Sequence, residues 1–370
     1  MTQTLSQRDQ RLDALRGFLL VIMLTCHLGT PLANFAASPF GFATSAEGFI
    51  LLSGFVAALV YGKRFIREGY LAMRRRVWRR TGQVYLCHLG LLLGGVLLVG
   101  LLGPSDAGPV SMIFDDWHAE RASAVVLSSV LLLFQPAFFD ILPIYVIGLF
   151  PTPLILRVGR ERGWWVVLGA SLVLWVAAQF GIKHGFEQWA RTFGPVALGS
   201  FDIFAWQLLW VSGLCLGSLH LEHGQSARTW RITPLALGVA VVVAIFFFGL
   251  RHGFLSIPSL TETGAMLNKW TLGPLRLLNI ACLIALLIAF APQSLPRFVG
   301  APLALLGRYS LPTFCFHIPL ALVGKEILYV YKPDALTATT MGLAAIALLF
   351  LPAWFSERRA RAELRPSGAL

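Results

Sequence analysis

The chain has 370 residues, of which 56% are hydrophobic and 13% are charged, and its mean hydropathy is +0.71. A soluble domain carries about 25% charged residues, so this composition excludes an ordinary soluble domain and favours a membrane protein. The net charge of +12 does not indicate a nucleic-acid partner, because the basic clusters adjoin apolar segments, where cytoplasmic loops of membrane proteins collect Lys and Arg.

Apolar stretches of about 17–25 residues are long enough to cross a bilayer as helices. The sequence predicts ten such spans, at 13–33, 43–62, 81–102, 140–157, 164–181, 202–220, 232–251, 271–291, 308–329 and 337–355. Segment 121–138 is also apolar but ends in Gln135 and Pro136, so it is either an eleventh span or a partial, re-entrant one.

Charge placement predicts the orientation of these spans. Segment 63–80 holds many basic residues against one acidic residue, Glu68, which predicts a cytoplasmic loop. With ten spans the later basic clusters also fall inside, whereas an eleventh span would put them outside. We therefore expect an all-α, polytopic membrane helix bundle of about ten transmembrane helices, with both termini cytoplasmic and residues 1–370 in a single membrane domain.

The first span carries ionisable residues, which are costly in a membrane and mark a functional site by default. His27 follows Arg16 by eleven residues, so the two lie within about 20° of one helix face and about 16 Å apart along the axis. Asp13 lies one turn before Arg16 and can pair with it. Either Asp13 and Arg16 are interfacial anchors, or this face is part of a site that has His27 deep in the outer leaflet.

The second span supplies a partner for His27. The loop 34–42 is short, so antiparallel packing puts Glu47 at a depth similar to that of His27, and Ser53 extends a polar stripe from Glu47. A carboxylate that holds one imidazole nitrogen leaves the other available as a base. A purely structural hydrogen bond between His27 and Glu47 is the alternative.

Two later spans carry polar residues near their outer ends. Asp202, Trp206 and Gln207 could bind a sugar by stacking and hydrogen bonds, although Trp is also common at membrane interfaces. The same two interpretations apply to Arg276 and Asn279.

A second intramembrane histidine, His317, lies between Pro312 and Pro319. These prolines would bend the helix and free backbone carbonyls that need a cavity or a neighbour. His317 therefore either lines the site or has a structural role. The five cysteines lie in apolar runs without a CxxC pair, so we expect no metal site.

Several of these residues lie in sequence patterns that resemble a known family. The spacing of Arg16 and His27 is similar to the first-helix motif of the acyltransferase-3 superfamily of membrane acyltransferases. Five segments, in order, more closely resemble the OpgC family, which succinylates osmoregulated periplasmic glucans; these are Arg11–Gly17, Ala46–Gly62, Phe204–Leu209, Leu272–Asn279 and Leu306–Pro312.

The resemblance implies a ten-helix bundle in the bacterial inner membrane that delivers an acyl group, succinyl in its narrower form, from cytoplasmic acyl-CoA to hydroxyls of a periplasmic glucan. Succinyl-CoA is then a substrate, and no cofactor is bound. The essential His and Arg of the family correspond to His27 and Arg16. In this interpretation His27, oriented by Glu47, deprotonates the acceptor hydroxyl. Direct transfer and a covalent acyl-enzyme on Ser53 both stay open.

Guanidinium groups suit the phosphates of CoA, because they bind phosphate through two parallel hydrogen bonds. We expect the donor to be bound by Asp13, Arg16, Arg74, Arg75, Arg76 and Arg308. We expect the acceptor or its pocket to involve Ser53, Asp202, Trp206, Gln207, Arg276, Asn279 and His317. The alternative for the arginine cluster 74–76 is that it serves topology alone.

A proton-coupled transporter of a small anionic or sugar substrate is the alternative function, because such carriers also bury His, Glu and Asp beside proline-broken helices. The two halves of the sequence show no internal repeat, which disfavours it. A structural scaffold would leave His27, Glu47 and His317 unexplained. The expected partners are the lipid bilayer, acyl-CoA and the glucan, and a homo-oligomer stays open.

Overall fold

The computed structural model describes residues 9–102, 108–114, 122–223, 232–290 and 295–363. In this part of the chain the regular elements are all α-helices, and the one β-contact is an isolated bridge between Phe134 and Ala197. The predicted all-α class is therefore confirmed. The chain divides into a terminal unit, Met1–Ala37 with Pro292–Leu370, and a central unit, Ser38–Ala291, so the single domain stays a prediction.

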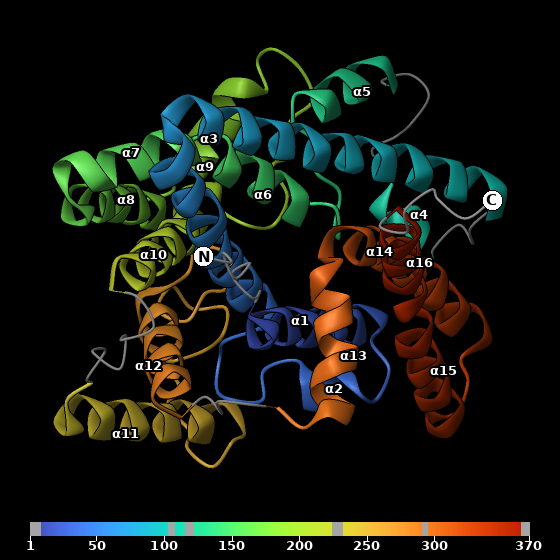
Figure 1. Ribbon diagram of the computed structural model, residues 1–370. Helices are drawn as coiled ribbons and strands as arrows, with labels where there is room; N and C mark the ends of the chain where they lie inside the picture. Colours follow the sequence, from blue (N-terminus) through green and yellow to red (C-terminus); the bar gives the residue numbers. More distant parts are fainter. Residues whose placement is uncertain (1–8, 103–107, 115–121, 224–231, 291–294, 364–370) are drawn as a thin grey trace, which may run out of the picture. The chain divides into compact units, whose positions relative to one another are not determined.

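The terminal unit is built around the first helix. Its helices are α1 (Gln10–Leu28), α2 (Ala33–Ala36), α13 (Arg297–Arg308), α14 (Ser310–Tyr331), α15 (Ala335–Leu348) and α16 (Phe350–Glu363). Helix α1 packs against α13, α14 and α15, and Figure 1 shows α13 crossing it. Leu24, Leu306 and Leu349 form part of the apolar core between these helices.

Glycines let α1 and α13 approach closely. A Cβ atom at Gly17 would collide with the carbonyl oxygen of Leu303, and one at Gly307 would collide with the carbonyl oxygen of Asp13. Helices in membranes commonly pack through small residues in this way, because backbones can then touch directly. The contact fixes the half of α1 that carries Asp13 and Arg16.

The central unit contains the remaining helices. They are α3 (Ser45–Leu102), α4 (Pro109–Ile113), α5 (Ala122–Val130), α6 (Ile141–Leu149), α7 (Thr152–Arg162), α8 (Trp164–Gln179), α9 (Ile182–Ala190), α10 (Ile203–His223), α11 (Pro234–Arg251) and α12 (Pro274–Phe290). Helix α10 packs along α3, where a Cβ at Gly54 or Gly213 would meet backbone atoms of the other helix.

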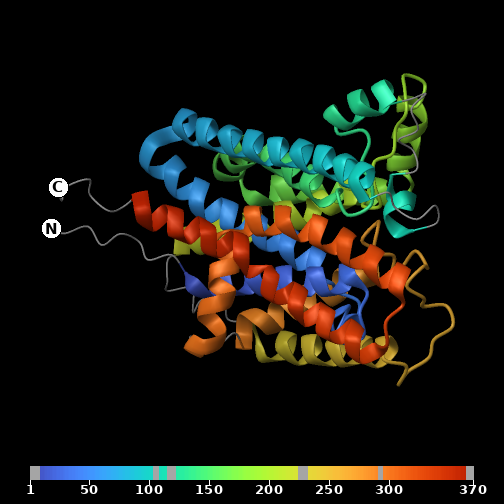
Figure 2. The same ribbon diagram turned by 90° about the vertical axis from the view of Figure 1, so that its right-hand side faces the viewer.

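The structure of α3 shows that one prediction was wrong. The basic segment 63–80 was expected to be a loop, but it is helical on both sides of Gly69, where two helices meet at a kink (Figure 2). Gly69 has φ 82° and ψ 174°, a conformation that favours glycine. Arg and Lys are good helix formers, so a run of them orients a segment without interrupting the helix.

The apolar helices support the assignment of the chain as a membrane protein, whereas the number of spans stays a prediction. In the described part of the chain five helical stretches are long and apolar enough to cross a membrane, or up to seven if each of two bent pairs is one span. The five are Ser45–Leu98, Ile203–Glu222, Pro234–Arg251, Ser310–Tyr331 and Ala335–Glu363. Each of the ten predicted spans overlaps a helix, and α3 overlaps two of them, 43–62 and 81–102.

Segment 121–138 is not one continuous helix. From Ala122 onward it forms α5, a helix of 9 residues, and the chain then turns to the bridge at Phe134. A helix of this length rises about 14 Å, which is less than the roughly 30 Å of a bilayer core. This geometry agrees with the partial interpretation of the segment.

Candidate functional site

Helix α1 is fixed at both ends by capping groups. The Asp9 carboxylate accepts a hydrogen bond from the Arg11 backbone N–H at 2.9 Å and caps the N-terminus. The side-chain hydrogen bond from Arg11 also lowers the pKa of Asp9 below its usual value. At the other end Gly29, with φ 73°, closes the helix by bonding to the carbonyl of Thr25. His27 therefore occupies the last turn of a well-defined helix.

Asp13 and Arg16 are both buried in the terminal unit. Both lie in the half of α1 that packs on α13, where the Asp13 carbonyl touches Gly307. The structure thus places these two residues inside the helix packing. Their predicted ion pair and their role in donor binding stay predictions.

The structure brings His27 and His317 together. Nδ1 of His27 lies 2.8 Å from Nε2 of His317, and the rings stack with centroids 4.9 Å apart. His317 is fully buried on α14, and His27 is half-buried on α1. One nitrogen of the bonded pair carries the hydrogen and the other accepts it, so each ring sets the tautomer of the other.

A single helix carries His317 and both prolines. Helix α14 runs from Ser310 to Tyr331 with Pro319 in its interior. Pro312 lies in the first turn, where the backbone N–H groups have no intrahelical acceptor, so a proline costs little there. His317 is thus presented to α1 by a helix, and the bend expected from the two prolines stays a prediction.

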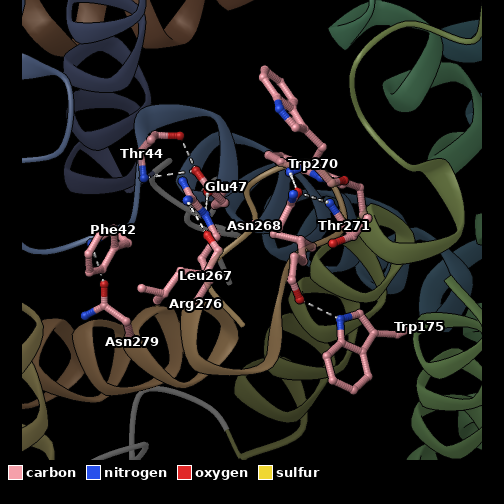
Figure 3. Close-up of polar contacts among 12 residues, drawn as sticks. Phe42, Thr44, Glu47, Trp175, Leu267, Asn268, Trp270, Thr271, Arg276 and Asn279 are labelled. Carbon is pink, nitrogen blue, oxygen red and sulfur yellow. Dashed lines mark hydrogen bonds and ion pairs between the residues drawn. The ribbon is translucent and has the colours of Figure 1, made fainter. Parts of the chain in front are cut away.

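Glu47 forms a buried ion pair in the central unit (Figure 3). Arg276 Nε donates to Glu47 Oε1 at 2.7 Å, and the two side chains are 2% and 1% exposed. Oε2 of Glu47 accepts hydrogen bonds from the backbone N–H and the hydroxyl of Thr44. The backbone bond is the capping-box arrangement of a helix N-terminus. The expected contact of Glu47 with His27 would join the two units and stays a prediction.

Arg276 and Asn279 lie one turn apart on α12 and hold the chain that leads into α3 (Figure 3). Arg276 Nη1 also donates to the carbonyl of Leu267 at 3.3 Å. The Asn279 carbonyl oxygen accepts from the Phe42 backbone N–H at 2.9 Å. Its amide nitrogen is buried and has no hydrogen-bond partner among the described residues. These two predicted pocket residues are therefore brought together with Glu47.

Asp202 and Trp206 are bound to the loop that precedes α12. The Asp202 backbone N–H and Trp206 Nε1 both donate to the carbonyl of Trp270, at 2.9 and 3.0 Å. The Trp206 ring is fully buried and packs against Phe201. This ring presents no open face to a sugar in this structure, whereas the residue Trp270 is 43% exposed.

Gln207 and Ser53 face other parts of the central unit. The Gln207 side chain accepts from the Ser171 hydroxyl at 2.7 Å and donates to the Ser171 carbonyl at 2.8 Å, which ties α10 to α8. Ser53 is buried in α3, and its hydroxyl has no hydrogen-bond partner among the residues that the structure describes. Their roles toward an acceptor stay predictions.

The arginines expected to bind the donor lie in both units. Arg16 and Arg308 are in the terminal unit, where Arg308 Nη1 lies 3.3 Å from a carboxylate oxygen of Glu357. Arg74 follows the kink of α3 in the central unit and stacks over the Trp78 ring at 4.9 Å, with Arg75 and Arg76 exposed beside it. Among the described residues no group of three or more His, Cys, Asp or Glu side chains is arranged to hold a metal ion.

Sequence reasoning missed two pairings, Glu47 with Arg276 and His27 with His317. Both partners of each pair were singled out as polar residues inside spans, so the intramembrane charge and imidazole were the available signal. The pairing itself depends on which helices pack together, which hydropathy does not encode.

Comparison with known proteins gives one family. A search of curated proteins and a search of solved structures found no match. The family model OpgC_C, described as OpgC protein, matches residues 8–361. This range is nearly the whole chain and includes every residue of the candidate site, and the protein is thus a member of the OpgC family.

Proposed function

We propose that this protein is a membrane O-acyltransferase that moves an acyl group, succinyl in its narrower form, from cytoplasmic acyl-CoA to hydroxyls of a periplasmic glucan. Membership of the OpgC family supports glucan modification and disfavours the transporter alternative. The main support for a catalytic role is the hydrogen-bonded pair of His27 and His317. Two imidazoles held together between apolar helices can accept a proton and pass it on.

In the proposed reaction His27 accepts the proton of a sugar hydroxyl while the hydroxyl oxygen attacks the thioester carbonyl carbon. The tetrahedral carbon then expels the CoA sulfur as the C–S bond breaks. The imidazolium of His27 returns the proton to the sulfur, which gives the sugar ester, CoA thiol and neutral His27. The negative end of the α1 dipole lies at this turn and favours the positive charge that develops on the ring.

His317 is proposed to position His27. A hydrogen bond at Nδ1 fixes the tautomer and the ring orientation of a histidine, so its Nε2 is the nitrogen aimed at the substrate. The sequence-based role of Glu47 in orienting His27 is proposed to act through the charge of its carboxylate, because Nδ1 and Nε2 of the ring are assigned to His317 and to the substrate. The ion pair with Arg276 would hold that carboxylate in place.

The proposed topology follows from this chemistry. Ten spans with both termini in the cytoplasm, in the inner membrane, put the basic residues of α3 on the side that supplies acyl-CoA. Asp13, Arg16, Arg308 and the cluster 74–76 would bind the donor from that side. Ser53, Asp202, Trp206, Gln207, Arg276 and Asn279 would shape or support the acceptor pocket.

The proposal is tested with purified protein in liposomes that enclose a glucan. Succinyl-CoA and acetyl-CoA are supplied separately outside, and the release of CoA thiol is followed with a thiol reagent. We expect release that depends on the enclosed glucan and is faster with succinyl-CoA. Glucan-dependent release with acetyl-CoA alone would keep the acyltransferase and replace the donor. No release with either donor, together with proton-coupled uptake of a solute, would contradict acyl transfer.

A further inference from the structure

An open cavity of about 540 Å³ lies where the C-terminal end of α13 meets α16 in the terminal unit. Its lining includes Leu305 and Arg308 of α13 and a set of residues on one face of α16, namely Trp354, Glu357, Arg358 and Arg361. The α16 residues follow the spacing i, i+3, i+4, i+7, which brings them onto one helical stripe. None of them except Arg308 belongs to the site described above.

The cavity carries more positive than negative charge. Arg308 and Arg361 share a single carboxylate, Glu357, at 3.3 and 2.9 Å. The guanidinium of Arg358 lies 3.8 Å from the centre of the Trp354 ring and has no carboxylate partner among the described residues. Among the described residues that line the cavity there are three guanidinium groups and one carboxylate, so the lining has a net positive charge that favours an anion.

The chemistry of the lining defines the anion. Guanidinium groups bind phosphate oxygens through paired hydrogen bonds, and a half-exposed indole is a surface on which a flat base can stack. The volume lies within the range of small-molecule sites, about 300–1,000 Å³. A phosphate-bearing molecule with an attached aromatic base fits these features better than an inorganic phosphate does.

We propose that this cavity binds the phosphate-bearing nucleotide end of the acyl-CoA donor, with Arg358 and Arg361 on the phosphates and Trp354 against the base. The inference rests on the proposed acyltransferase function. A phosphate also occurs in anionic lipid headgroups, and basic pockets at the cytoplasmic ends of membrane helices can bind those. The experiment therefore distinguishes the two sources.

The first arm compares two donors. Succinyl-CoA carries the nucleotide, whereas succinyl-N-acetylcysteamine has the same thioester without it. The variants are Arg358→Gln, Arg361→Gln and Trp354→Leu, and we expect each to raise the KM for succinyl-CoA. The rise should be about tenfold or more in the two arginine variants, because each of them loses a charge-assisted hydrogen bond. The KM for succinyl-N-acetylcysteamine should not change. The matched control is Arg359→Gln, an exposed arginine on the same helix that does not line the cavity.

The second arm measures binding without turnover. Adenosine 3′,5′-bisphosphate is titrated into the intact protein in nanodiscs of phosphatidylcholine alone, and then in nanodiscs that also contain cardiolipin. We expect binding in both, lost in Arg358→Gln and kept in Arg359→Gln. Binding that cardiolipin abolishes, with no change in either KM, would assign the cavity to lipid and overturn the proposal.

The failure of the inference differs from the failure of the proposed function. If neither donor is used by the wild-type chain, the acyltransferase proposal fails, and nucleotide binding by the second arm still decides the cavity. If both donors are used and the cavity variants leave both KM values unchanged, the function stands and the cavity assignment is wrong. Melting temperatures of all variants are measured so that a misfolded variant is not read as a binding defect.

Discussion

At the scale of single residues, the ion pair of Glu47 with Arg276 stabilises the fold and fixes the position of two buried charges. Both groups have lost water almost completely, so each depends on the other for compensation. Thr44 and the Leu267 carbonyl satisfy further atoms of the pair, which makes a network of four residues around the start of α3. A network of this kind is stable only when it is complete.

We predict that Arg276→Leu destabilises the protein by about 3–5 kcal/mol, because it leaves the Glu47 carboxylate buried and uncompensated. Thermal unfolding in detergent measures the change. The double variant Glu47→Leu/Arg276→Leu should recover much of the loss, since it removes both charges. Additive losses in the double variant would show that the two residues do not act as a pair.

The second residue-scale prediction concerns His317. His317→Ala should lower kcat by about 10²-fold and leave the KM for acyl-CoA within about twofold, because His27 would lose the group that fixes its orientation. His317→Gln should restore part of the rate, since an amide can still hydrogen-bond to Nδ1. His184→Ala, at an exposed histidine of α9, is the control. An unchanged kcat in His317→Ala would reduce His317 to a packing residue.

The candidate site was only partly predictable from the sequence. Polar residues inside spans, such as His27, Glu47 and Arg276, were recognisable because charge and imidazole are rare there. Their partners were not, because Glu47 and Arg276 are far apart in the sequence and meet only where the fold brings the first turns of α3 and α12 within ion-pair distance. Trp206 shows the opposite case, since an indole predicted to meet a sugar is fully buried.

At the scale of elements, close contacts between helices depend on glycine. Helix α1 touches α13 at Gly17 and Gly307, and any added side chain must push the backbones apart. This contact holds the half of α1 that carries the predicted donor residues. Shifting it would tilt α1 and so move His27 away from His317.

We predict that Gly307→Val destabilises the protein by about 1–3 kcal/mol or more, because the new side chain overpacks the contact with the Asp13 carbonyl. Gly169→Val in α8 is the control, since a Cβ there meets no atom within 4 Å. Melting temperatures in the same detergent compare the two. Equal effects of the two substitutions would contradict the close approach of α1 and α13.

The helices themselves were largely predictable, because an apolar run of about 20 residues has few alternatives to a helix in a membrane. The structure of the segments between the apolar runs was less predictable. Segment 63–80 was expected to be a loop on the basis of its charge, yet arginine favours helix and only Gly69 bends it. Segment 121–138 could not be assigned from hydropathy alone, and its helix ends at Val130.

At the scale of the whole molecule, the proposed reaction needs a donor and an acceptor on opposite sides of the membrane. The basic residues around the kink of α3 and at the end of α16 are proposed to lie on the cytoplasmic side, as the positive-inside rule predicts. The family match over residues 8–361 covers both units, so the proposed activity belongs to the chain as a whole.

The fourth prediction tests this topology. Green fluorescent protein fused after Glu363 should fluoresce, and alkaline phosphatase at the same site should be inactive, because the C-terminus is proposed to be cytoplasmic. Alkaline phosphatase inserted in segment 252–270, between α11 and α12, should be active. Active phosphatase after Glu363 would require an odd number of spans or a reversed orientation.

The central claim is that His27 transfers the proton during acyl transfer to a glucan. The acyl transfer is measured directly by mass spectrometry of the glucan after incubation with succinyl-CoA that carries ¹³C in the succinyl group. We predict labelled succinyl esters with the wild-type chain and a loss of about 10²-fold or more in His27→Ala at unchanged membrane insertion and melting temperature. Full labelling by a folded His27→Ala variant would contradict the account, and so would glucan that carries no label with the wild-type chain.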